Sequence, residues 1–177
     1  MAWQQTISIP ALLLSAVWPC CFAADARPEY EIKAAFLLNF TKFVEWPPAA
    51  FADSNSLFAI CILGRDPFGR TLDDIVEGEA VDGRKLTVRR ISETPTRQTC
   101  QLVFFAESVR ETRHVLSALG PGVLTVGDHE NFIRDGGMIG FVIDNRRVRF
   151  DINESVAETA GLKLSSKLLN VARSVEK

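Results

Sequence analysis

The stretch Phe58-Ala59-Ile60-Cys61-Ile62-Leu63-Gly64-Arg65-Asp66-Pro67-Phe68-Gly69 decides the fold. Its first six residues are all apolar, and a run of this length predicts a β-strand that is buried on both faces. Asp66 and Pro67 are typical of a helix start, because aspartate caps free N–H groups and proline fits the first helical position. The stretch therefore predicts the first half of a βαβ unit. The turn after such a strand is a common ligand site in open α/β sheets.

The first 24 residues predict a secretory signal peptide. Segment 9–22 is mostly apolar and is followed by Ala23, Ala24 and the charged Asp25. An apolar segment of this kind is shorter than the roughly 20 residues that span a bilayer, and it ends in small residues, as signal peptides do. No lysine or arginine precedes the segment, which is atypical of a signal peptide. An uncleaved anchor is the alternative. We expect cleavage near Ala23 or Ala24 and one exported α/β domain over residues 25–177.

The charge and the cysteines of the mature chain limit the classes of partner. The formal net charge is −2, and a slightly acidic exported protein is a poor candidate for nucleic-acid binding. Cys20 and Cys21 leave with the signal peptide, so that Cys61 and Cys100 remain. An even cysteine count in an oxidising compartment favours one disulfide, with two unpaired thiols as the alternative.

Strands and helices alternate along the rest of the chain. We expect further strands over 85–91, 101–106 and 123–126, and a hairpin whose arms are 138–143 and 147–152. We expect helices over 29–46, 66–76, 108–119, 129–134, 155–160 and 164–171. The helix at 108 is predicted to open with a capping box, Ser108 to Glu111. This alternation predicts a three-layer α/β/α sandwich with a mostly parallel central sheet, and with the antiparallel hairpin at its edge.

The first predicted helix has a wide apolar stripe. Apolar side chains recur at helical spacing at Ile32, Ala35, Phe36, Phe40, Phe43 and Val44, and Leu37 and Leu38 widen the stripe. Such a helix is either deeply buried or has a second face that contacts a partner. For the second case, the candidate partner surface includes Phe36, Phe40 and Trp46.

Three turns are predicted to meet at the carboxyl ends of the parallel strands, where a ligand site would lie. They are Gly64-Arg65-Asp66, Glu107-Ser108 and Gly127-Asp128-His129. The candidate ligand residues are Arg65, Asp128 and His129. Neither G-x-G-x-x-G nor a P-loop ending occurs in the first turn, which argues against a dinucleotide or nucleotide phosphate site.

These turns do not predict catalysis or metal binding. Neighbouring residues such as Asp128 and His129 point apart at a helix start, and no second ligand cluster completes a metal site. A hydrolase built from Ser108, Asp128 and His129 is the weakest alternative, because no recognised motif frames these residues. We therefore predict a binding or regulatory protein with no cofactor and no enzymatic activity.

Seven segments, in order and spread over nearly the whole mature chain, resemble the YfiR family of periplasmic proteins. They are IKAAFLLNFTKFVEWP at 32–47, CILGRDPFG at 61–69, CQLVF at 100–104, LTVGD at 124–128, GGMI at 136–139, VRFDIN at 148–153 and AGLKLSSKLL at 160–169. Each segment alone is a weak signal, but together they are specific.

The resemblance implies a regulator that represses an inner-membrane diguanylate cyclase by binding its periplasmic sensor domain, which lowers cyclic di-GMP and biofilm formation. It also implies a homodimer, sequestration by an OmpA-like outer-membrane lipoprotein, and a structural disulfide between Cys61 and Cys100. A second cysteine pair of some family members is missing here, because nothing after Cys100 is cysteine. A periplasmic small-molecule-binding sensor that serves another membrane receptor is the alternative function.

Overall fold

The apolar stretch 58–63 forms strand β2 (Phe58–Leu63), in which all six residues are buried. The structure is a computed structural model that describes residues 27–177, so the predicted signal peptide lies outside the described residues. β2 pairs in parallel with β4 (Arg84–Ile91) on one side and with β5 (Leu102–Phe105) on the other. The predicted burial of this strand on both faces is therefore confirmed.

The central sheet has eight strands in the order β10-β8-β7-β6-β5-β2-β4-β3. Its pairs are parallel from β4 through β7, whereas β7 pairs antiparallel with β8 and β3 antiparallel with β4. The strands not yet delimited are β3 (Ala80–Val81), β6 (Leu124–Gly127), β7 (Ile139–Asp144), β8 (Arg147–Asn153) and β10 (Ser174–Glu176). The predicted α/β class with a mostly parallel sheet is confirmed.

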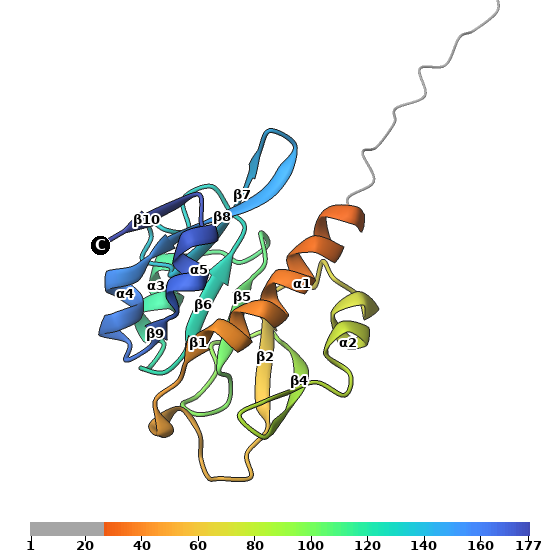
Figure 1. Cartoon of the computed structure of the whole chain (residues 1–177), viewed down its shortest axis with the longest axis vertical. Helices are drawn as coiled ribbons and strands as arrows, with labels where there is room; N and C mark the ends of the chain where they lie inside the picture. Colours follow the sequence, from red (N-terminus) through yellow and green to blue (C-terminus); the bar gives the residue numbers. More distant parts are fainter. Residues whose placement is uncertain (1–26) are drawn as a thin grey trace, which may run out of the picture.

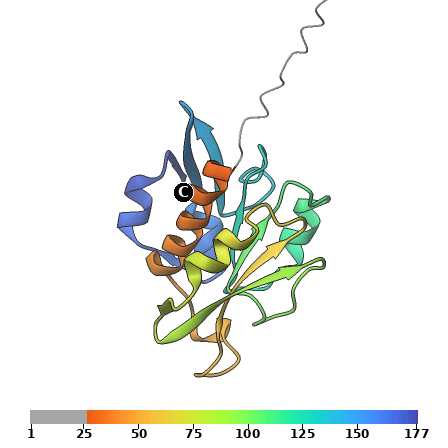
Figure 2. The ribbon, with the colours of Figure 1, turned by 90° about the vertical axis from the view of Figure 1, so that its right-hand side faces the viewer.

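Helices cover both faces of this sheet (Figures 1 and 2). The helices are α1 (Arg27–Phe43), α2 (Arg70–Val76), α3 (Thr112–Ala118), α4 (Glu154–Thr159), α5 (Ser166–Val171) and the 3-10 helix η1 (Pro48–Ala50). α1 and α2 lie side by side on one face, and α3 lies on the other (Figure 2). A separate two-stranded sheet joins β1 (Val44–Glu45) to β9 (Lys163–Leu164).

Two apolar clusters lie on the two faces of the sheet because side chains alternate along each strand. In β2, Phe58, Ile60 and Ile62 belong to the cluster under α1 and α2. Cys61 and Leu63 belong to the smaller cluster, which also contains residues of α3. The larger cluster is rich in phenylalanine and includes Phe40, Phe68, Phe104, Phe141 and Phe150.

Two predicted helix boundaries are wrong. The first helix ends at Phe43 and not at residue 46, because Val44 and Glu45 pair with β9. α2 begins at Arg70 and not at residue 66, because Gly69 adopts a φ of +56°, which a continuing helix cannot contain. The Asp66 carboxylate accepts the N–H of Phe68 at 2.7 Å, and this bond closes a turn ahead of the helix.

The predicted capping box and the helix at 129–134 are also wrong. Ser108 does not cap α3, because its hydroxyl accepts the N–H of Arg65 at 2.8 Å. Glu111 has a φ of +56° and forms no side-chain cap, so α3 starts only at Thr112. Residues 129–134 form consecutive turns.

The C-terminal hairpin is present as predicted, with one addition. Asn145 and Arg146 form its two-residue turn, both with positive φ, as hairpin turns of this length favour. Asn153 caps α4 by accepting the N–H of Val156. The sequence did not predict β10, which pairs in parallel with β8 and lies outside the hairpin at the edge of the sheet.

Candidate functional site

The connections that leave β2 and β5 define the topological switch point of the sheet. β2 continues through α2 to β4 on one side, and β5 continues through α3 to β6 on the other side. Ligands of open α/β sheets bind outside the carboxyl ends of strands at such a point. The candidate site predicted from the turns at Gly64 and Glu107 therefore lies at the position that the topology favours.

The turns after β2 and β5 touch each other at this switch point. Gly64 has a φ of +91°, and a Cβ on it would lie 2.7 Å from the Ser108 hydroxyl oxygen. The Arg65 N–H donates to the same oxygen. Glycine is therefore required at position 64 for both its backbone conformation and the close approach.

A depression of about 500 Å³ opens beside these two turns. Its volume is within the range of about 300–1,000 Å³ that is typical of small-molecule sites. The lining residues are Leu63, Gly64, Ser92, Glu93, Thr94, Ser108, Val109, Arg110 and Val115. The Arg65 side chain is exposed and is not among them, so that Arg65 takes part in the switch point through its backbone only.

Asp128, from the third turn, is instead bound to α1. Its Oδ2 atom accepts the Tyr30 hydroxyl at 2.9 Å and the Lys33 ammonium at 3.2 Å. The side chains of Lys33 and Asp128 are only 5% and 4% exposed. Lys33 also donates to Glu29 at 2.5 Å, one turn earlier in the helix. These four residues fasten the first turns of α1 to the end of β6.

Burial and the Asp128 carboxylate both raise the pKa of Tyr30 well above its ordinary value of 10. Burial has the larger effect, because it disfavours the phenolate, and the negative charge of Asp128 adds to it. Tyr30 is therefore a neutral hydrogen-bond donor in the folded protein. The ammonium of Lys33 lies 4.5 Å from the centroid of its ring, which adds a cation–π contact.

Asp128 and His129 do not form a joint site. Asp128 lines a depression together with Glu29 and Lys33, whereas His129 lines another together with Phe132. The His129 ring packs edge-on against Phe132 at 5.2 Å between centroids. Its buried Nε2 atom has no hydrogen-bond partner in the described part of the chain, so it does not contact the Ser108 hydroxyl.

Metal binding finds no support in the described residues. Between residues 27 and 177, no group of three or more histidine, cysteine, aspartate or glutamate side chains is placed to hold a metal ion. The buried Asp128 Oδ1 atom lacks a hydrogen bond in this range, while Oδ2 of the same carboxylate is fully engaged by Tyr30 and Lys33.

The candidate partner residues of the first helix differ in exposure. Phe40 is 0% exposed and is part of the core, so it does not belong to a surface. Phe36 is half-buried and packs against Phe150 at 5.3 Å between ring centroids. Trp46 is half-buried as well, and its indole N–H donates to the carbonyl oxygen of Gln101 at 3.1 Å.

The outer face of α1 carries other apolar side chains. Ile32 is 47% and Phe43 37% exposed, and Ala35 is exposed between them. The apolar stripe predicted for this helix is thus split, with one part in the core and another part on the surface. We define the α1 outer face as Ile32, Ala35 and Phe43.

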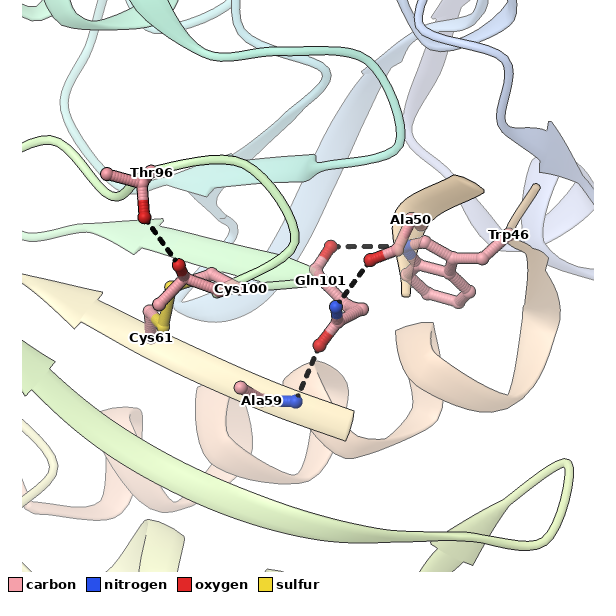
Figure 3. Close-up of a disulfide and its surroundings, with 8 residues drawn as sticks. Trp46, Ala50, Ala59, Cys61, Thr96, Cys100 and Gln101 are labelled. Atoms are coloured by element: carbon pink, nitrogen blue, oxygen red, sulfur yellow. Dashed lines mark hydrogen bonds between the residues drawn. A yellow bond between two sulfur atoms is a disulfide. The ribbon is translucent and has the colours of Figure 1, made fainter. Parts of the chain in front are cut away.

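The disulfide between Cys61 and Cys100 is confirmed, with a Cα–Cα distance of 5.9 Å. It joins β2 to the residues that precede β5 (Figure 3). Next to it, the buried side chain of Gln101 accepts the Ala59 N–H at 2.8 Å and donates to the Ala50 carbonyl at 2.7 Å. The amino ends of β2 and β5 and the 3-10 helix η1 are thereby held together.

Sequence reasoning missed Tyr30 and Lys33 as parts of a buried polar cluster. The signal for Lys33 is its helical phase, because Lys33, Leu37, Phe40 and Val44 recur at spacings of three and four, and all are buried. A lysine in a buried helix position requires an acidic partner. The partner, Asp128, lies 95 residues away in the sequence, where no local pattern indicates it.

The fold is that of a disulfide-bonded α/β domain with a mostly parallel sheet. Residues 30–173 match the family described as DUF4154, YfiR/HmsC-like, and the chain belongs to this family. Its members are periplasmic regulators in cyclic di-GMP signalling that act with a membrane partner, and the family is a regulatory one. A search of curated proteins finds no relative of the chain.

The disulfide accords with a periplasmic location. The Cys61–Cys100 disulfide is of the kind that forms and persists in an oxidising compartment. In the described range, no helix has the length and apolar character needed to cross a membrane.

Proposed function

We propose that the protein represses an inner-membrane diguanylate cyclase by binding the periplasmic sensor domain of that enzyme. Repression would lower cyclic di-GMP and biofilm formation. The observation that carries this proposal is the family match, which covers residues 30–173 and thus nearly the whole described chain. In this proposal the chain acts as a binding protein and not as an enzyme.

The α1 outer face is the proposed contact surface for the sensor domain. Ile32, Ala35 and Phe43 have spacings of three and eight residues, which place them on one side of a helix. Apolar side chains that are exposed in the free protein favour an interface, because its buried centre is poor in charged residues. Phe36 borders this surface and ties it to the core through Phe150.

Deletion of the gene tests the proposed repression. We expect the deletion to raise cyclic di-GMP and surface attachment, and the wild-type gene to restore both. Unchanged cyclic di-GMP, in cells whose membrane cyclases are intact, would contradict the proposal.

A matched pair of variants tests the contact surface. Ile32 and Leu57 are both 47% exposed, but Leu57 lies outside α1 in the segment before β2. Ile32→Glu should lose repression, and Leu57→Glu should retain it, provided that both proteins melt close to the wild type. Equal activity of the two variants would exclude the α1 outer face as the contact surface.

The assembly is also part of the proposal. We expect a homodimer in solution, and capture of the protein by an OmpA-like outer-membrane lipoprotein would relieve repression. Light scattering at micromolar concentration measures whether the protein is a dimer. Co-purification with the candidate lipoprotein measures whether the lipoprotein captures it. A monomer at all concentrations tested would contradict the dimer.

A second candidate function is a small-molecule-binding sensor that serves another membrane receptor. The depression at the switch point, beside Gly64 and Ser108, favours it. A thermal-shift screen with periplasmic metabolites should then find a ligand that stabilises the wild type, and Ser108→Ala should weaken the shift. The absence of any stabilising compound would count against this function.

A further inference from the structure

The β7–β8 hairpin projects from the body of the protein (Figure 1). It is closed by the two-residue turn at Asn145 and Arg146, and its strands pair as far as Asp144 and Arg147. The tip is therefore narrow and convex.

Three arginines at this tip form no ion pair with any residue that the structure describes. Arg146, Arg147 and Arg149 are exposed, and no acidic group of the described chain lies within salt-bridge distance of them. Of the two acidic residues in the hairpin, Asp151 is bound by Arg173 at 2.8 Å, whereas Asp144 forms no ion pair with a described residue. The tip is thus positive in a chain whose formal net charge is −2.

A large apolar side chain accompanies these arginines. Ile143 is 54% exposed and lies two residues before the turn. In the antiparallel register Ile143 is opposite Val148, while Arg147 and Arg149 flank Val148 on the other face of the hairpin. The tip therefore presents an isoleucine on one face and guanidinium groups on the other.

We propose that this hairpin binds the anionic phospholipid surface of a membrane. A guanidinium group can bind phosphate with two parallel hydrogen bonds, and amphipathic segments with an apolar face and an opposite basic face are typical of the headgroup region. A convex two-strand tip can enter a soft headgroup layer, whereas a protein partner would need a complementary acidic groove. The inference does not depend on the cyclase proposed above.

The expected strength of binding to an anionic lipid surface follows from the number of arginines at the tip. Each basic residue near an anionic lipid surface contributes on the order of a few-fold in partitioning, so three arginines together give roughly 100-fold. The attraction should weaken with salt, because it is screened within a Debye length.

Vesicle flotation of the mature chain, from residue 25 onward, tests the proposal. The probes are vesicles of phosphatidylcholine alone and with about one third phosphatidylglycerol. We expect binding that requires phosphatidylglycerol and falls with salt. The variant Arg146→Gln, Arg147→Gln and Arg149→Gln should lose it, and Ile143→Ser should weaken it several-fold.

The matched control removes three exposed basic side chains elsewhere, through Arg70→Gln, Lys85→Gln and Arg89→Gln. It should bind like the wild type, and unchanged melting temperatures exclude unfolding in either triple variant. No phosphatidylglycerol-dependent binding by the wild type, or equal loss in the two triple variants, would overturn the proposal. Binding to immobilised polyglutamate without binding to vesicles would overturn it too, in favour of an acidic protein partner.

Discussion

The two faces of the central sheet are stabilised in different ways. The face under α1 and α2 buries a large aromatic cluster, in which Phe40 contacts Phe36, Phe141 and Phe150. The face under α3 has a much smaller cluster, and α3 is only seven residues long. The disulfide of Cys61 lies on this second face. A covalent link thus stabilises the face where little apolar surface is available for burial.

The largest expected effect concerns the aromatic face. Phe40→Ala should lower the free energy of unfolding by about 3–5 kcal/mol, because it leaves a cavity in a fully buried position. Urea denaturation measures the loss. Phe43→Ala, on the same helix but 37% exposed, is the control and should cost about 1 kcal/mol or less. A similar loss in both variants would remove the distinction between the buried and the outer face of α1.

The second largest loss of stability is expected when the disulfide is removed. The two cysteines are 39 residues apart, and in the chain-entropy model a loop of this length stabilises by about 4 kcal/mol. The double variant Cys61→Ala and Cys100→Ala should therefore unfold at a lower urea concentration and be exported in lower yield. Identical unfolding of the wild type with and without reductant would show that the α3 face does not depend on the bond.

Substitution of Gln101 tests whether its polar contacts, at the point where strands β2 and β5 begin, contribute to the free energy of unfolding. Gln101→Leu leaves the Ala59 N–H and the Ala50 carbonyl buried without partners, which should cost about 1–3 kcal/mol. Gln98 is exposed and also donates to two backbone carbonyls. Gln98→Leu is therefore the matched control, and we expect less than half the loss. Urea denaturation of both variants decides between a structural and a negligible role.

The smallest expected effect is the pH dependence that Tyr30 introduces on the α1 face. Since its pKa in the folded protein is raised above the unfolded value, its contribution is complete below pH 10 and is lost as the pH rises through the folded pKa. The difference in stability between the wild type and Tyr30→Phe should shrink above pH 10, by at most about 1.4 kcal/mol per pH unit. Unfolding measurements at pH 9, 10 and 11 test this.

Tyr30 is the only tyrosine of the chain, so absorbance at 295 nm reports its ionisation without other tyrosines. We expect the folded protein to show no tyrosinate at pH 10.5, and the protein in urea to show it. Ionisation at the same pH in both conditions would contradict the buried contact with Asp128.

The sequence predicts the long buried elements well, because they carry their signal in consecutive residues. The strands at 58–63 and 102–105 are wholly apolar, and the hairpin has both alternation and a suitable turn. β1 and β9 have two residues each and β10 has three, which is too short for a periodic pattern.

Other features depend on contacts between distant residues, and the sequence could not predict them. Ser108 matches a capping pattern, but a tertiary hydrogen bond from Arg65 takes its hydroxyl. The position of Asp128 in a turn predicts a role in the candidate site, whereas its hydrogen bonds are to Tyr30 and Lys33, 98 and 95 positions away in the sequence. Local patterns indicate which residues are buried, but not which distant polar groups they meet.

The contact between α1 and β8 has a consequence for export. α1 is the first element of the described chain. Its residues Phe36 and Phe40 pack against Phe150, which lies in β8 near the carboxyl terminus. The aromatic core therefore cannot close until nearly the whole polypeptide has emerged on the far side of the membrane. If the predicted signal peptide directs export, the chain would cross the membrane before this core can form, and it would therefore still lack the core during translocation.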